Sequence, residues 1–332
     1  MSDQVGVLGA GAWGTTLAVL LADAQRPVSL WTRSPETAER LAHARGNERY
    51  LPGVVFPPNL RVVTDDAYLG EPHRFYVVAV PSEHVRSTVL HLRTVLRPGA
   101  PILSVVKGIE EGTHLRMSEV IAEELPDRPI AVLSGPNLAR EIAAGKPAGS
   151  VIASPDAELA AELAAVLSSD RFRVYTNPDV IGVELGGALK NVIAIAAGVV
   201  EGTGLGHNAL AALITRGLAE ISRLAVAAGG RRDTLAGLSG LGDLVLTCTG
   251  ALSRNRHVGI ELARGRTLDE VLAGMKTVAE GVRTTDAALA LGKRHGVELP
   301  ITAQVAELLA GRKDARTALY DLMLRPQRSE AG

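Results

Sequence analysis

The sequence predicts an α/β Rossmann-type N-terminal domain with a mostly parallel sheet, followed by an all-α C-terminal domain. The chain has 332 residues, which is too long for one ordinary small domain. Short β-branched strands alternate with helical patterns through its first half, as in βαβ units. Beyond residue 178 the patterns are helical, with almost no strand signal. We therefore expect an α/β domain at 1–177, a helical domain at 178–325 and a polar tail at 326–332.

The composition fits this organisation and excludes several classes of protein. Hydrophobic residues make up 46% of the chain and aromatic residues only 3%, so the cores must consist of Leu, Val, Ile and Ala. The net charge is −1, with no basic run, which argues against a nucleic-acid partner. The single cysteine, Cys248, excludes an intramolecular disulfide and a cysteine-built zinc site. We expect no metal site, since His207 also lacks a matching ligand spacing.

We expect a cytoplasmic protein without membrane insertion. One cysteine fits a reducing compartment. The chain begins directly with a strand pattern, and no cationic leader precedes an apolar stretch. The most apolar run, 192–200, is too short to span a bilayer.

A glycine-rich turn joins the first strand, 5–8, to the first helix. Gly9, Gly11 and Gly14 follow the pattern G-x-G-x-x-G. The first glycine permits a tight turn, the second lets a pyrophosphate approach bare backbone, and the third lets the helix pack closely on the strand. The helix N-terminus offers N–H groups and a partial positive charge to the phosphates. The turn predicts dinucleotide binding; the alternative is a tight turn that binds nothing.

The segment after the second strand, 27–31, bears on the choice of cofactor. NAD-selective sites usually place an acidic residue there to bind the ribose hydroxyls. This chain has Arg33 instead, and a guanidinium can face a 2′-phosphate. We therefore expect NADP(H), or the use of both NADP(H) and NAD(H); the alternative is that Arg33 is a solvated loop residue.

The α/β alternation then continues to the end of the first half. Ligands bind at the carboxyl edge of a parallel sheet. Lys107 follows one strand directly and is therefore expected at the same edge as the glycine turn. We expect strands at 61–64, 75–80, 101–106, 130–133, 149–153 and 172–175, helices at 36–45, 115–124 and 157–167, and a loop at 47–59.

The second half contains a helix that is apolar on nearly every face but carries Lys190 and Asn191. Such a helix should be buried. A buried lysine must pair, lose its proton or face a cavity. The alternative is that the ammonium reaches water from a helix edge. Gly186 and Gly187 each cost about 1 kcal/mol in a helix, which indicates a close approach of backbone or ligand.

Two further polar stretches are candidates for ligand binding. Asp243 follows a glycine-rich loop, 237–242, and could cap a helix, contact a ligand or do both. Ser253, Arg254 and Asn255 offer a hydroxyl, a guanidinium and an amide within one turn, which suits a phosphate. A solvated basic loop is the alternative for this stretch.

Nine stretches of the chain together are typical of one family. They lie at 9–15, 104–110, 134–136, 174–179, 186–191, 213–217, 240–244, 253–255 and 278–282. In these stretches the sequence resembles the bacterial-type NAD(P)-dependent sn-glycerol-3-phosphate dehydrogenases, from the first strand to about residue 325. The resemblance implies an oxidoreductase that interconverts dihydroxyacetone phosphate and sn-glycerol 3-phosphate with NAD(P)(H). It also implies a small phosphorylated substrate and a role in supplying glycerol 3-phosphate for phospholipid synthesis.

The resemblance implies roles residue by residue. Lys190 would be the catalytic acid–base, in a catalytic group with Lys107 and Asp243. Besides the three glycines, the cofactor contacts would come from Ala12, Trp13, Arg33, Lys107, Ala139, Arg254, Val278 and Glu280. The substrate would be bound by Lys107, Gly135, Asn137, Lys190, Asn191, Asp243, Thr247, Ser253, Arg254 and Asn255. The family usually has Ser or Thr at position 137, but Asn137 can still form a hydrogen bond to the substrate. The loop 206–210 around His207 also departs from the family pattern, so no role is assigned in that loop.

The chemistry of ketone reduction agrees with these roles. The reaction needs a hydride donor, a proton donor and stabilisation of the developing alkoxide. The nicotinamide supplies the hydride, and Lys190 can give the proton to the carbonyl oxygen. Burial and the cation of Lys107 would lower the pKa of Lys190, whereas the substrate phosphate would raise it. The direction of the net shift therefore stays open.

Two alternatives compete with this interpretation. A β-hydroxyacid-type dehydrogenase also pairs a Rossmann half with a helical half, but it carries Lys-x-x-Asn, whereas Lys190 and Asn191 are adjacent. A non-catalytic nicotinamide-binding redox sensor would keep the glycine turn but would not need a buried Lys190. A homodimer through the helical half is compatible with the sequence, although no residue requires it.

Overall fold

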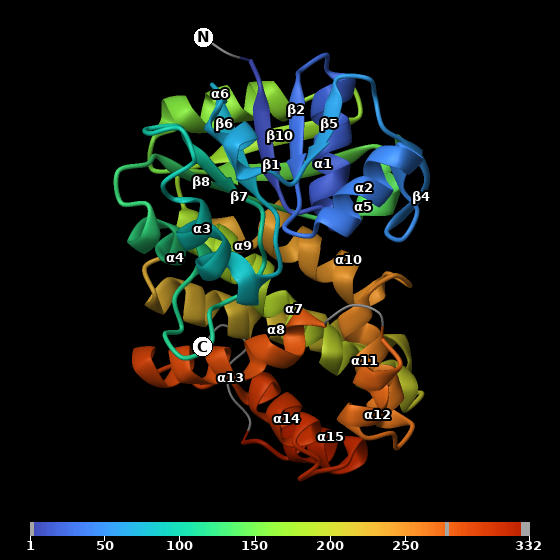
Figure 1. The fold of residues 1–332 in the computed structure, drawn as a ribbon. Helices are drawn as coiled ribbons and strands as arrows, with labels where there is room; N and C mark the ends of the chain where they lie inside the picture. Colours follow the sequence, from blue (N-terminus) through green and yellow to red (C-terminus); the bar gives the residue numbers. More distant parts are fainter. Residues whose placement is uncertain (1–2, 276–278, 327–332) are drawn as a thin grey trace. The chain divides into compact units, whose positions relative to one another are not determined.

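The computed structural model describes residues 3–275 and 279–326 (Figure 1). The chain divides into two compact units. The first consists of Met1–Glu110 and Leu115–Glu184, and the second of Glu111–His114 and Leu185–Gly332. The division falls inside a long helix, α7 (Val180–Gly202).

The first unit is built on an eight-stranded sheet, in the order β10-β9-β8-β7-β6-β1-β2-β5. Every neighbouring pair is parallel except β8 with β9. The strand order reverses between β1 and β6, which creates a switch point at the carboxyl edge of β1. The predicted Rossmann-type domain is thus confirmed. The strands are β1 (Val5–Leu8), β2 (Val28–Trp31), β5 (Leu60–Val63), β6 (Phe75–Val78), β7 (Ile102–Ser104), β8 (Ile130–Ser134), β9 (Ala148–Ala153) and β10 (Phe172–Asn177).

Helices cover both faces of this sheet, because successive strand residues point to opposite sides. Val77 of β6 packs in one core with residues of α1, α2 and α6. Its neighbours Tyr76 and Val78 pack in the other core with residues of α3 and α4. The helices of the unit are α1 (Ala12–Asp23), α2 (Pro35–Ala44), α3 (Val85–Leu92), α4 (Met117–Glu124), α5 (Ala139–Ala143) and α6 (Ala157–Leu167).

The prediction of a loop at 47–59 is partly wrong, because this segment contains most of a small antiparallel ribbon. The ribbon consists of β3 (Gly46–Asn47) and β4 (Leu51–Val55). Pro52 and Gly53 are residues typical of loops, so the sequence pattern does not indicate a strand here. Pro52 has no N–H to donate, but an edge strand of a two-stranded ribbon can accommodate such a residue. The other strands and helices of this unit lie within a few residues of their expected positions.

A buried histidine in this unit makes stability depend on pH. His73 is 0% exposed and stacks on Tyr76 with ring centroids 5.1 Å apart. Its Nδ1 lies 2.8 Å from the Glu71 carbonyl oxygen and therefore carries the proton, so Nε2 accepts from Gln4 Nε2 at 3.2 Å. Burial lowers the pKa of His73. The unfolded chain then binds this proton at a higher pH than the folded chain, and stability is lost as the pH falls below about 6.5.

We expect the free energy of unfolding of His73→Asn to change less between pH 7.5 and 5 than that of wild type. Asparagine can donate at the Nδ1 position but cannot take up a proton there. Urea titrations at the two pH values measure the difference. His43→Asn, at an exposed position on α2, should keep the wild-type dependence. An unchanged pH dependence in His73→Asn would contradict the assignment.

The second unit is helical, as predicted: among its described residues there are helices and turns but no strand. The loop expected at 237–242 is instead mostly a π-helical turn, Leu238–Gly242. The helices after α7 are α8 (Gly206–Ala227), α9 (Arg232–Leu235), α10 (Asp243–Thr249), α11 (Arg254–Ala263), α12 (Leu268–Ala273), α13 (Glu280–His295), α14 (Pro300–Leu309) and α15 (Ala315–Met323).

The helix α7 is buried along most of its length. The apolar run 192–200 is only part of it, and the whole helix has 23 residues and is long and apolar enough to cross a membrane by length and composition alone. In the most apolar window of α7, 83% of the residues are buried inside the protein. That is the environment of a core helix.

Candidate active site

The three glycines of the first turn are required for different reasons. Gly9 has φ +117°, and a Cβ there would lie 2.8 Å from the Ala79 carbonyl oxygen. A Cβ on Gly14 would lie 2.1 Å from the carbonyl oxygen of Gly9. The packing of the protein therefore explains these two glycines. A Cβ on Gly11 would meet nothing within 4 Å, so the space beside it is open to a ligand.

The N-terminus of α1 is suited to an anion. Its N-cap is Gly11, which has no side chain with which to cap the first turn, and that turn contains no acidic residue. The first N–H groups of a helix have no partner within the helix, and they lie at its positive end. Ala12 and Trp13 lie in this first turn, and the Trp13 ring packs edge-on against Phe172 with centroids 6.4 Å apart. The turn thus fits the pyrophosphate of a dinucleotide.

Arg33 lies just beyond the carboxyl end of β2, as predicted, at the same edge of the sheet as the glycine turn. The strands β1 and β2 are paired in parallel, with Leu8 beside Trp31, so both end at the same edge. Arg33 follows β2 by two residues and is exposed. The next residue, Ser34, caps α2 by accepting from the Thr37 N–H at 3.1 Å. The contact of Arg33 with a cofactor stays a prediction.

Lys107 and Gly135 lie together at the carboxyl edge of the sheet. The Lys107 ammonium donates to the Gly135 carbonyl oxygen at 2.9 Å. The side-chain amide of Asn137 already has hydrogen-bond partners within the protein. Its Oδ1 accepts from Ser150 Oγ at 3.1 Å, and its Nδ2 lies 3.5 Å from the Gly149 carbonyl oxygen. The strand β9 thus accommodates the amide that replaces the usual hydroxyl.

Ala139 begins α5 and is tied to the glycine turn. Its carbonyl oxygen accepts from Thr16 Oγ1 at 3.2 Å, and the same hydroxyl contacts the Ala12 carbonyl oxygen at 2.9 Å. Two of the predicted cofactor residues, Ala12 and Ala139, therefore lie close together, because their carbonyl oxygens contact the same Thr16 hydroxyl.

In the second unit, Lys190 is buried and paired. Its side chain is 8% exposed, and its ammonium donates to Asp243 Oδ1 and, at 2.7 Å, to Thr247 Oγ1. The Thr247 hydroxyl donates to the Asp243 backbone oxygen at 2.6 Å, so its lone pairs can face the ammonium. The alternative that the lysine reaches water from a helix edge is therefore wrong.

Asp243 is not a plain N-cap. It is the first residue of α10, its side chain is 1% exposed, and the N-cap position belongs to Gly242. Its carboxylate instead holds Lys190. A Cβ on Gly186 of α7 would lie 2.8 Å from the Ser239 carbonyl oxygen, so the predicted close approach at this glycine is made by backbone.

Two buried asparagines link three helices. Asn191 Oδ1 accepts from Asn255 Nδ2 at 2.9 Å, and Asn255 Oδ1 accepts from the Gly281 N–H at 2.9 Å. These bonds join α7, α11 and the first turn of α13, which begins with Glu280. The predicted cofactor residue Val278 lies outside the described residues.

The stretch 253–255 starts α11 rather than forming a basic loop. Ser253 caps the helix by accepting from the Arg256 N–H at 3.2 Å. Arg254 is exposed on the first turn. The Arg256 guanidinium pairs with Glu201 of α7.

Two residues without a predicted role, Cys248 and His207, lie in helices of the second unit. Cys248 lies buried in α10, and burial raises the pKa of its thiol to about 12. His207 lies in the first turn of α8 and not in a loop. Within residues 3–275 and 279–326, no group of three His, Cys, Asp or Glu side chains is placed to hold a metal ion.

Comparison with known proteins extends over nearly all of the chain. The family models that describe the N-terminus and the C-terminus of NAD-dependent glycerol-3-phosphate dehydrogenase match residues 4–160 and 179–320. A glycerol-3-phosphate dehydrogenase [NAD(P)+] from Thermobifida fusca is 55% identical over 271 residues, which cover 81% of each chain. Its counterpart from Acidobacterium capsulatum is 52% identical over 277 residues, which cover 81% of this chain and 82% of the relative.

A solved structure shows the same architecture. The crystal structure of glycerol-3-phosphate dehydrogenase from Coxiella burnetii aligns with a TM-score of 0.93 at 40% identity, covering 98% of this chain and 99% of the other. The chain therefore belongs to the NAD-dependent glycerol-3-phosphate dehydrogenase family.

Proposed function

We propose that this chain interconverts dihydroxyacetone phosphate and sn-glycerol 3-phosphate by hydride transfer with NAD(P)(H), with Lys190 as the general acid and base. Its family membership supports the reaction and the cofactor. The observation that carries the mechanism is the buried lysine held by a carboxylate and a hydroxyl. A cation in that setting is fixed in place before a substrate arrives.

In the direction of reduction, a bound nicotinamide would supply the hydride that the carbonyl carbon of the substrate takes up. The C=O π electrons move to the oxygen, and Lys190 Nζ donates the proton that completes the hydroxyl. In the reverse direction neutral Lys190 removes that proton. Asp243 holds the ammonium in place, and Thr247 fixes the direction of one of its N–H bonds.

The phosphate of the substrate is assigned to the start of α11. Arg254 is exposed in the first turn of this helix. A guanidinium beside the N-terminus of a ten-residue helix is well suited to a phosphate. Binding energy from this remote group would orient the carbonyl for reaction, and Asn191 would contribute a further polar contact.

The residue after the carboxyl end of β2 bears on the choice between NADP(H) and NAD(H). Arg33 occupies the place where an NAD-selective site usually has an acidic residue, and it is exposed. This supports the use of NADP(H), or of both cofactors. We further propose a cytoplasmic enzyme that supplies glycerol 3-phosphate for phospholipid synthesis, with a homodimer as a compatible assembly.

The two alternatives have less support. A β-hydroxyacid-type dehydrogenase would carry its asparagine three residues after the lysine, but here it is the adjacent Asn191 that bonds Asn255. A redox sensor has no use for a lysine buried between Asp243 and Thr247. Both alternatives also conflict with the family matches over the two parts of the chain.

Turnover of dihydroxyacetone phosphate tests the reaction and the cofactor preference together. The loss of reduced-nicotinamide absorbance is followed with NADPH and with NADH, in wild type and in Arg33→Ala. We expect wild type to turn over, and kcat/KM for NADPH to fall about tenfold or more in Arg33→Ala, as expected for one charge-assisted contact. The value for NADH should change little.

Arg40→Ala serves as the control, because Arg40 is another exposed arginine on the neighbouring helix α2. It should leave both cofactors unaffected. Cofactor binding without turnover of dihydroxyacetone phosphate would refute the proposed substrate. Equal losses for NADPH and NADH in Arg33→Ala would refute recognition of the 2′-phosphate.

A further inference from the structure

A buried asparagine outside the glycine motif holds the glycine turn in place. Asn47 lies on β3 and is 1% exposed. Its Nδ2 donates to the Ala10 carbonyl oxygen at 3.0 Å and to Thr15 Oγ1 at 2.8 Å. A carbonyl oxygen can only accept, so the amide nitrogen, and not the amide oxygen, must face Ala10. Both amide hydrogens are therefore used within the glycine turn.

The contact with Ala10 fixes the direction of the next N–H group. The peptide bond between Ala10 and Gly11 is planar and trans, so its C=O and N–H point in opposite directions. Holding the carbonyl oxygen towards Asn47 turns the Gly11 N–H away from it. The space beside Gly11 is open, since a Cβ there would meet nothing within 4 Å. The bond to Asn47 thus keeps the Ala10 carbonyl oxygen, which would repel an anion, turned towards the protein, and we infer that the Gly11 N–H is left to face a ligand.

The second contact anchors the start of the helix. Thr15 is fully buried, and its N–H donates to the Gly11 carbonyl oxygen at 2.9 Å in the first turn of α1. By bonding Ala10 and Thr15 together, the amide of Asn47 spans the turn from one side to the other. The donors of the first helical turn are therefore held in one arrangement.

Asn47 is itself rigidly placed. It pairs with Leu51 of β4, and its carbonyl oxygen accepts from the Tyr50 N–H at 3.0 Å. The preceding Gly46 allows the ribbon to close, because a Cβ there would lie 2.9 Å from the Val54 carbonyl oxygen. The small ribbon thus serves as a support for the glycine turn.

We propose that Asn47 is a positioning residue for the pyrophosphate of the nicotinamide cofactor. It acts through the peptide bond between Ala10 and Gly11 and does not itself touch the phosphate. Asn47 should therefore affect binding of the pyrophosphate, which NADH and NADPH have in common. The inference rests on cofactor binding in the proposed function, and it can be tested by direct binding without turnover.

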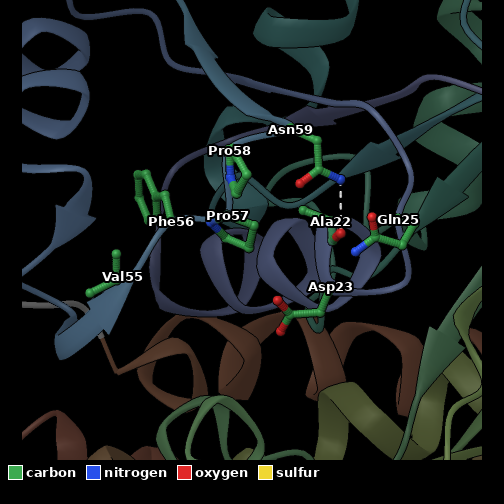
Figure 2. Close-up of a pocket in the computed structure, with 8 residues that line it drawn as sticks. All are labelled: Ala22, Asp23, Gln25, Val55, Phe56, Pro57, Pro58 and Asn59. Carbon is green, nitrogen blue, oxygen red and sulfur yellow. Dashed lines mark hydrogen bonds between the residues drawn. The ribbon is translucent and has the colours of Figure 1, made fainter.

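The same helix offers a matched control at its other end. Asn59 Nδ2 donates to the Ala22 carbonyl oxygen at 2.8 Å and to the Arg26 carbonyl oxygen at 2.7 Å. Figure 2 shows the first of these bonds at the edge of a pocket of about 720 Å³, which is lined by residues of the C-terminal end of α1 and the segment 55–59. Asn59 thus ties down α1 with the same chemical group, but far along the helix from the glycine turn.

Equilibrium titrations of NADPH and NADH into wild type, Asn47→Ala and Asn59→Ala test the proposal, with thermal unfolding measured for each protein. We expect Asn47→Ala to raise both dissociation constants by the same factor, about tenfold, as expected for the loss of one hydrogen bond. Asn59→Ala should lower the unfolding temperature but leave both dissociation constants within about twofold. Asn47→Ser, which keeps one donor, should give an intermediate increase and remains informative if Asn47→Ala does not fold.

Steady-state kinetics separate positioning from chemistry. In Asn47→Ala the KM for NADPH should rise, while kcat at saturating cofactor stays close to the wild-type value. Unchanged dissociation constants in Asn47→Ala and Asn47→Ser would overturn the proposal, as would an equal increase in Asn59→Ala. A larger loss for NADPH than for NADH would point to the 2′-phosphate and would also overturn it. If wild type binds both cofactors but does not turn over dihydroxyacetone phosphate, the proposed reaction fails while the inference about Asn47 stands.

Discussion

Replacing Lys190 with methionine should lower kcat for reduction of dihydroxyacetone phosphate by about 10³-fold, within the range for removal of a general acid. Methionine keeps most of the volume of the side chain in an apolar helix but cannot deliver a proton. The substitution also leaves the carboxylate of Asp243 buried without its cation, which costs about 3–5 kcal/mol when a buried pair is broken. The variant should therefore be combined with Asp243→Asn, which removes the buried negative charge.

Kinetics and direct NADPH titration measure the effect. The single and double variants should bind NADPH with nearly wild-type affinity, since the lysine is assigned to the carbonyl and not to the nucleotide. Lys190→Arg is a second control, because a guanidinium keeps the positive charge but does not release its proton near neutral pH. If kcat in the folded Lys190→Met/Asp243→Asn protein stays within tenfold of wild type, Lys190 is not the acid.

Replacing Gly259 with alanine should lower the free energy of unfolding by about 3 kcal/mol, at the upper end of the usual cost of overpacking. A Cβ at this position would lie 1.9 Å from the Ile195 carbonyl oxygen and 2.9 Å from the Cα of Gly198. The crossing is equally tight from the other side, where a Cβ on Gly198 would lie 2.0 Å from the Arg256 carbonyl oxygen. Since both obstacles are backbone, α7 and α11 would have to move apart.

Urea titration measures the loss of stability in Gly259→Ala. Gly274→Ala is a matched control, because its φ is −83° and the nearest atom to a Cβ there lies 3.6 Å away. It should unfold at nearly the wild-type urea concentration. Separation of α7 and α11 should also weaken the bond between Asn191 and Asn255, so kcat/KM should fall in Gly259→Ala. If Gly259→Ala has the stability of wild type, α7 and α11 can move apart without a loss of stability, and the prediction is wrong.

The sequence predicts the local parts of this structure well and the tertiary parts poorly. The glycine turn and the alternation of strands with helices depend on neighbouring residues, and both are found where the patterns place them. The polar pair Lys190 and Asn191 was identified because charge is rare in an apolar helix. The partner of that lysine, by contrast, is 53 residues further along the chain, and only the folded unit brings it close.

Two features could not be predicted for identifiable reasons. Pro52 and Gly53 are typical of loops, and only pairing with β3 makes that segment a strand. Asn47 lies just before them and has no pattern that distinguishes it from a turn asparagine. Its importance depends on contacts with Ala10 and Thr15, more than thirty residues earlier in the chain.

The single thiol of the chain gives the folded protein a further property. Cys248 lies in α10 between Asp243 and the end of the helix, and it is 1% exposed. Alkylating reagents and peroxides react with the thiolate, and a buried thiol with its pKa raised to about 12 remains protonated near neutral pH. We therefore expect Cys248 to react slowly in the folded protein, so that its modification by an alkylating reagent would report the opening of α10.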